Sequence, residues 1–266
     1  MAHESFPPRS SGRRRLGRAC PLGVAALLAF LVSAPPVLAQ NSGKGFLFKR
    51  PAGSFSLRGG YAVANAGSAV FDDAITQLTL DKRDFSSWTF GGDISYAATP
   101  RLDIAFDGQF STASRNSEFR KWTDNNDNPI EQATKFQRIP LTLNLKYYVT
   151  DRGREVSQFA YIPSRYAAYI GVGAGAMYYK FGQNGDFIDF NTDNLEIFSS
   201  NIEDSGWTPT LNGLAGFDYS LGPWVALSFE GRYQWARAQL DPDTFVGYDK
   251  IDLSGFTGTV GFKVRF

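Results

Sequence analysis

The chain has 266 residues, of which 15% are aromatic and 27 are glycine, and its formal net charge is +1. This length suits one or two domains, and the aromatic and glycine content is unlike that of a typical soluble α/β protein. The near-neutral charge argues neither for nor against nucleic acid, and we predict no nucleic-acid partner.

Residues 1–39 have the pattern of a secretory signal peptide. A basic stretch with five arginines precedes an apolar run at 21–34, and small residues follow, including Val37 and Ala39. An apolar run of about 14 residues is too short to span a bilayer, which takes about 20. We therefore expect cleavage after Ala39, although a buried N-terminal helix is a competing interpretation.

Removal of this segment changes the chemistry available to the rest of the chain. The five arginines and Glu4 contribute +4, so residues 40–266 carry a formal charge of −3. The only cysteine, Cys20, and the only histidine, His3, also lie in the segment. We expect no disulfide, no zinc site and no cofactor in the mature protein.

The mature chain is predicted to be a series of amphipathic β-strands. Apolar and polar residues alternate in each strand, as when successive side chains point to opposite faces of a sheet. The C-terminal segment is the clearest case, with Phe256, Val260, Phe262, Val264 and Phe266 on one face. Eight such segments lie at about 54–63, 88–96, 102–110, 139–149, 165–180, 207–219, 225–235 and 251–266.

The connections between these strands are alternately long and short. A tight turn at Ala98–Pro100 joins the second and third strands, and another at Leu221–Pro223 joins the sixth and seventh. The connection at 150–164 has an uncertain role, and no stretch shows a helical period of useful length. We expect a leader at 40–53 and one domain at 54–266, with long polar loops at about 65–86, 112–135, 181–205 and 238–250.

Alternation alone does not say which face lies inside. A secreted lipocalin-like carrier would turn its apolar face inward, whereas a membrane barrel would turn it toward lipid. Strands of roughly 10–15 residues suit a tilted membrane crossing better than a small soluble barrel. Aromatic residues also line the ends of the apolar face, as at a membrane interface. They are Tyr61, Trp88, Tyr96, Tyr147, Tyr166, Tyr178, Trp207, Tyr219, Tyr233 and Trp235.

The signal peptide, the eight amphipathic strands, the loop pattern and the terminal strand ending in Phe266 resemble the bacterial outer-membrane β-barrels of the outer-membrane protein A transmembrane type. The resemblance covers residues 54–266. It implies an all-β fold, a closed antiparallel eight-stranded up-and-down transmembrane β-barrel in the cell outer membrane. It also implies that Val260, Phe262, Val264 and Phe266 form the signal read by the outer-membrane assembly machinery.

Such a barrel is just wide enough inside for side chains to fill it. Charges enclosed there must be paired, because an uncompensated one costs several kcal/mol. For the carboxylates Asp93, Asp103 and Asp107 we predict Arg58 as the counterion, with Arg232 second. The predicted lumen charge network, structural or pore-lining, comprises Arg58, Asp93, Asp103, Asp107, Lys146, Asp218, Glu230 and Arg232.

Several functions remain open at this stage. Enzymes of the family depend on an active-site histidine, which residues 40–266 lack, so we predict no enzymatic activity. A structural or surface-interaction role is favoured over a narrow porin, and over a secreted carrier. Lipopolysaccharide and membrane lipid are the expected partners, and the protein is expected to be monomeric.

An acidic outer loop is predicted from Asp186, Asp189, Asp193, Glu196, Glu203 and Asp204. This loop is either solvated or in contact with cations or a basic partner.

Overall fold

The computed structural model describes residues 46–124, 127–157, 159–188, 197–248 and 250–266, all within the unit Ser42–Phe266. The predicted signal peptide, and the leader before residue 46, lie outside the described residues. The elements are β1 (Gly53–Ala64), α2 (Ala69–Gln77), the 3-10 helix η1 (Lys82–Phe85), β2 (Ser87–Ala97), β3 (Leu102–Thr123), β4 (Pro129–Tyr148), β5 (Gly153–Ser157), β6 (Ala160–Pro163), β7 (Tyr166–Ile188), β8 (Ile197–Ser220), β9 (Val225–Gln239), β10 (Lys250–Asp252) and β11 (Gly255–Arg265).

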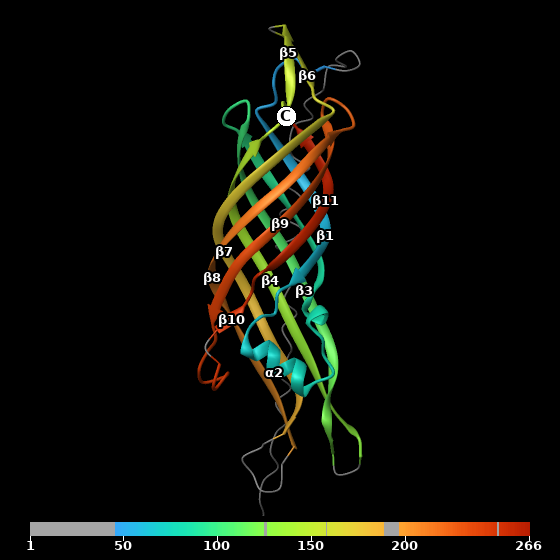
Figure 1. The fold of residues 1–266 in the computed structure, drawn as a ribbon, viewed down its shortest axis with the longest axis vertical. Coiled ribbons are helices and arrows are strands. Elements are labelled where there is room, and N and C mark those ends of the chain that lie inside the picture. Colours follow the sequence, from blue (N-terminus) through green and yellow to red (C-terminus); the bar gives the residue numbers. More distant parts are fainter. Residues whose placement is uncertain (1–45, 125–126, 158, 189–196, 249) are drawn as a thin grey trace, which may run out of the picture. The chain divides into compact units, whose positions relative to one another are not determined.

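The main sheet closes on itself. Its strands follow the order β1-β2-β3-β4-β7-β8-β9-β11, and β11 pairs again with β1, from Ser54 opposite Arg265 to Ala64 opposite Gly255. Every pairing is antiparallel, so the ring is an eight-stranded up-and-down barrel, as the sequence predicts (Figure 1). Closure leaves no unpaired edge in the wall.

The barrel is apolar outside and polar inside. Outward side chains such as Trp88, Val172 and Phe262 are 69%, 65% and 60% exposed, whereas the inward Arg58 and Lys146 are 4% and 1% exposed. A soluble carrier would show the opposite arrangement. The lipocalin-like alternative is therefore wrong, and the outer surface is suited to acyl chains.

Two of the predicted loops are largely strands. β3 and β4 stay paired to Glu118 opposite Glu131 and, after a register shift, pair again at Thr123 opposite Pro129; β7 and β8 stay paired to Ile188 opposite Ile197. The sequence analysis assigned 112–135 and 181–205 to loops because their polar–apolar alternation fades. In these extensions buried side chains such as Ser117, Gln132 and Thr134 are polar, and so are exposed ones such as Ser114, Asn116 and Lys135, so backbone pairing persists without the hydrophobic period that reveals a strand.

The 65–86 connection contains α2 and η1, which the sequence analysis missed. The helix has nine residues and buries Val70, Phe71 and Ala74, too few turns for a readable period. In η1, Asp81 and Asp84 form a capping box that starts the turn. Among the described residues, no helix has the length and apolar character needed to cross a membrane.

The two ends of the barrel differ. Short turns, the C-terminus and the hairpin β5–β6 lie at one end, and α2 with the long hairpins lies at the other (Figure 1). We call these the turn end and the loop end; in outer-membrane barrels the short turns face the periplasm. The uncertain connection at 150–164 is thus a hairpin at the turn end. It is tied to the N-terminal segment by two hydrogen bonds of 2.8 Å between Leu47 and Tyr161.

Candidate functional site

The centre of the lumen holds a cluster of buried charges. Alternation along the strands turns Arg58 of β1, Lys146 of β4 and Glu230 of β9 inward, where their side chains are at most 1% exposed. Glu230 lies 2.6 Å from an Nη of Arg58, 2.8 Å from Arg232 and 3.1 Å from Nζ of Lys146. The Tyr169 hydroxyl donates a further hydrogen bond of 3.1 Å to it. One carboxylate therefore joins three cations.

Two aspartates complete this central cluster. Asp107 contacts Arg58 and lies 2.6 Å from Arg232, while Asp93 lies 3.2 Å from Arg58 and 3.4 Å from Lys146. Three cations thus face three carboxylates, and the formal charge of the central cluster is zero. This balance is what a low-dielectric interior requires of buried ions.

A second group of charges fills the lumen near the turn end. Nζ of Lys263 lies 2.7 Å from Asp218, which also accepts a 3.0 Å hydrogen bond from Tyr148. Asp103 lies 2.6 Å from Arg152, whose guanidinium stacks 4.1 Å from the centre of the Tyr148 ring. The predicted counterion Arg58 therefore serves Asp93 and Asp107 but not Asp103.

The partners that the sequence analysis missed differ in how readily they can be seen. Lys263 lies on the polar face of the C-terminal strand, so its inward direction is visible in the alternation. Arg152 lies in the connection after β4, where no period indicates direction, and only the folded chain brings it to Asp103. All eight predicted lumen charges are at most 4% exposed.

The loop end of the lumen is closed by a buried apolar cluster, here called the apolar cap. Phe71 of α2 is fully buried, with its ring 4.7 Å from that of Phe85, 5.3 Å from Phe136 and 5.5 Å from Phe181. Further members are Ala64, Ala66, Val70, Ala74, Leu78, Leu80, Ala113, Met177, Tyr179, Ala236, Ala238, Leu240, Phe245, Ile251 and Leu253. Sequence analysis missed the cap because its residues lie in stretches assigned to loops or to the polar face.

Aromatic side chains form two outward bands. Near the loop end, the rings of Tyr61 and Trp88 lie 5.7 Å apart, and those of Tyr178 and Trp207 lie 5.5 Å apart. Tyr233 and Trp235 continue this band, and Tyr96, Tyr147, Tyr166 and Tyr219 form the band at the turn end. Two aromatic girdles that flank an apolar belt are the pattern expected at the two interfaces of a bilayer.

The predicted acidic loop is only partly within the described residues. Asp189, Asp193 and Glu196 lie outside them. Asp186, Glu203 and Asp204 stand on β7 and β8, and each has a partner: the Ser199 hydroxyl, Lys180 at 2.6 Å and the Tyr179 hydroxyl at 2.8 Å, respectively. In the described part of the chain no group of three or more potential metal ligands is found.

The predicted assembly signal lies on the outer face of β11. Val260, Phe262, Val264 and Phe266 are between 45% and 60% exposed. The main-chain N–H groups of Ala52 and Gly53 donate hydrogen bonds of 2.8 and 3.1 Å to the Phe266 carbonyl oxygen. The end of the chain is therefore held in the wall, while its apolar side chains face outward.

No protein-family model and no curated protein matches the chain. Solved structures of similar fold include the outer membrane protein OprG from Pseudomonas aeruginosa, 18% identical over 83% of this chain and 99% of that one, with a TM-score of 0.44. Ail of Yersinia pestis is 15% identical, covering 80% and 99%, with a TM-score of 0.41. Neisserial surface protein A is also 15% identical, covering 80% and 96%, with a TM-score of 0.39. The barrel assignment itself rests on the strand pairing of this chain.

Proposed function

We propose that this protein, an integral β-barrel of the bacterial outer membrane, is non-conducting and serves a structural or surface-interaction role. The observation that supports the proposal most is the filled lumen. The six groups of the central cluster are at most 4% exposed and pair with one another across the barrel. A solute crossing here must first separate buried ion pairs.

The energy of that separation argues against a resting pore. Breaking a buried pair costs about 3–5 kcal/mol, because the remaining charge is left without compensation. Glu230 joins three cations, so a path through the centre disturbs several pairs together. The apolar cap is a second barrier in series, since an ion entering it loses hydration without gaining polar partners.

The loop end provides the surface for an interaction role. The extensions of β3, β4, β7 and β8 continue beyond the aromatic band as two paired hairpins. Ile197 and Phe198 at the start of β8 are 38% and 47% exposed, and Phe198 stacks on Phe187 at 5.9 Å. Apolar side chains on a water-facing hairpin suit contact with a partner or with the sugar and lipid surface around the barrel.

The same proposal includes the partners and the absence of catalysis. Lipopolysaccharide and membrane lipid surround the aromatic bands, and the outward face of β11 is the surface offered to the assembly machinery. Residues 40–266 contain no histidine or cysteine, so the nucleophile–histidine arrangements of many hydrolases cannot form there. We therefore propose a non-enzymatic protein that acts as a monomer.

Planar-bilayer recording tests the proposal against the narrow porin. Purified protein should give no reproducible single-channel steps under conditions in which a general porin conducts. Phe71→Ala, which opens the apolar cap, should stay silent because the central cluster still fills the lumen. Reproducible steps from the unmodified protein would establish the pore. Steps from Phe71→Ala alone would show that the apolar cap, rather than the central cluster, is the barrier.

A further inference from the structure

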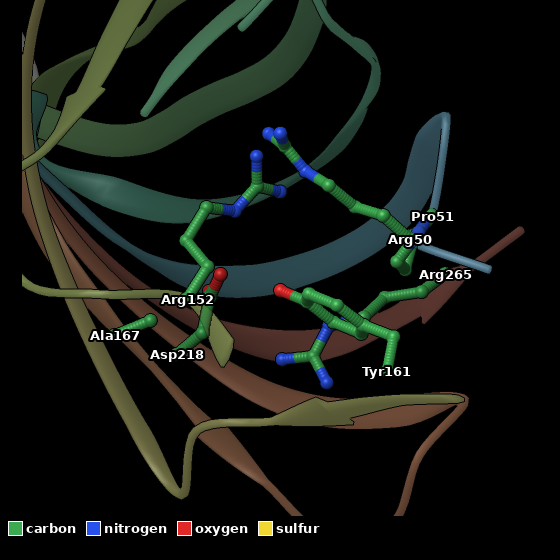
Figure 2. Close-up of a pocket in the computed structure, with 7 residues that line it drawn as sticks. All are labelled: Arg50, Pro51, Arg152, Tyr161, Ala167, Asp218 and Arg265. Carbon is green, nitrogen blue, oxygen red and sulfur yellow. The ribbon is translucent and has the colours of Figure 1, made fainter. Parts of the chain in front are cut away.

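A small pocket lies in the lumen at the turn end, beside the charges described above. Its lining includes Arg50, Arg152, Tyr161, Asp218 and Arg265. These residues come from separate parts of the chain: the N-terminal segment, the β4–β7 connection, β8 and the last strand. Figure 2 shows Arg50, Arg152 and Tyr161 reaching from different segments toward one opening, with the guanidinium of Arg265 beneath the Tyr161 ring.

The pocket has more positive charge than its carboxylates compensate. Arg152 is paired with Asp103, and Asp218 is paired with Lys263. Arg50 donates to the carbonyl oxygen of Thr99 and Arg265 donates a 2.9 Å hydrogen bond to the Ser220 hydroxyl, both neutral acceptors. Neither arginine forms an ion pair with a carboxylate of the described residues, so two positive charges remain.

Arg265 has one donor that lacks an acceptor. It is 93% buried, and its Nη1 has no hydrogen-bond partner in the described part of the chain. A buried guanidinium donor without an acceptor is costly, and neighbouring guanidinium groups add electrostatic repulsion. An oxyanion between these groups would relieve both penalties at once.

We propose that this pocket binds a phosphate group from the periplasmic side. Guanidinium forks bind phosphate oxygens in pairs, and two uncompensated positive charges match a phosphate dianion better than a single carboxylate. The Tyr161 hydroxyl adds a neutral donor.

The space around the pocket suits this ligand. The inner pocket has a volume of about 10 Å³, enough for one oxygen-sized group. It adjoins a wider recess of about 300 Å³ that shares Arg50, Arg152 and Tyr161. The recess adds Arg101, which pairs with Asp151 at 2.6 Å, and the exposed carboxylate of Glu155. The phosphate places one oxygen inward while the rest of the group stays in the recess. The central cluster closes the other side, so the site is a terminal binding site and does not depend on the proposed function.

Binding would join three segments of the turn end. Arg50 precedes β1, Arg152 precedes the hairpin β5–β6, and Arg265 ends β11. A shared phosphate therefore holds the N-terminal segment and the hairpin against the last strand. We expect phosphate to slow backbone hydrogen exchange at 46–52 and 153–163.

The test is isothermal titration of inorganic phosphate into the protein folded in phosphatidylcholine nanodiscs. We expect one saturable site with a dissociation constant of about 1 mM or lower. Arg50→Gln should weaken it at least about tenfold, because a charge-assisted contact is lost. Arg50 is half-buried and precedes the first strand of the barrel wall, so we expect the Arg50→Gln protein to fold. Arg154→Gln, an exposed arginine on β5, is the matched control and should bind like the unmodified protein.

A second arm identifies the source of the phosphate. Phosphatidylglycerol in the nanodiscs should weaken the binding of inorganic phosphate if the lipid headgroup reaches the pocket. It should leave the binding unchanged if the natural ligand is soluble. Each of these two outcomes supports a phosphate site. Absence of saturable binding, or equal affinity in the unmodified protein and Arg50→Gln, overturns the proposal. If phosphate does not change hydrogen exchange at 153–163, the inferred role of phosphate in joining the three segments is wrong.

Discussion

Replacement of Glu230 by glutamine provides a direct test of the central cluster. The side chain keeps its shape but loses its charge, so three cations face only Asp93 and Asp107. One of its oxygens contacts Arg58 and Arg232, and the other contacts Lys146 and Tyr169. The amide nitrogen of glutamine must then face one of these donor pairs.

The expected cost follows from the burial of the cluster. The Glu230 side chain is 0% exposed, so solvent does not screen the unbalanced charge. We expect Glu230→Gln to lower the free energy of unfolding by about 3–5 kcal/mol. Arg58→Gln should cost a similar amount, because it leaves the cluster with one excess negative charge.

The double variant separates charge balance from loss of contacts. Arg58→Gln/Glu230→Gln restores a neutral cluster, so its cost should be smaller than the sum of the single costs by about 1–3 kcal/mol. Glu203→Gln is the matched control: it removes a 2.6 Å pair with Lys180, but the two side chains are 38% and 28% exposed. It should change stability by no more than about 1 kcal/mol.

Urea unfolding in lipid vesicles, followed by tryptophan fluorescence, measures these differences. The reasoning would be refuted if Glu230→Gln cost no more than Glu203→Gln. It would also be refuted if the effects of Arg58→Gln and Glu230→Gln were additive.

Three further predictions concern the apolar cap, the membrane boundary and the outer loop. Phe71→Ala should destabilise the apolar cap by about 3–5 kcal/mol, which should be measurable as faster hydrogen exchange at 65–86. The matched control Asp72→Ala changes an exposed residue and should not speed this exchange. Equal exchange rates in the two variants would contradict the packing of Phe71. Brominated lipid should quench Trp88 strongly in a single-tryptophan variant and Trp122, on the extension of β3, weakly; the reverse order would displace the membrane boundary. Burial and the hydrogen bond to Asp73 raise the pKa of Tyr248 to about 12, so its protonated form is favoured in the folded loop. That stabilisation is present below pH 10 and is lost between about pH 10 and 12, so proteolysis at 241–248 should rise in that range and Tyr248→Phe should abolish this pH dependence.

The sequence by itself determined the wall of this barrel. Alternation in segments such as 251–266 divides the residues of each strand between two faces, because that period depends only on backbone geometry. Strand length and the aromatic residues at the ends of the apolar face then indicate that this face lies outside. The inward direction of Glu230 and the outward direction of Phe262 are therefore readable without a structure. The positions of the two aromatic bands follow from the same alternation and from strand length.

Only the tertiary structure decided which inward groups meet and how the ends close. Partners such as Asp103 and Arg152 depend on strand stagger and on a connection that has no period. The apolar cap depends on α2, whose nine residues are stabilised by the barrel mouth and show no helical signal of their own. Local periodicity encodes which face a residue occupies, but contacts across the lumen arise only when the ring is closed.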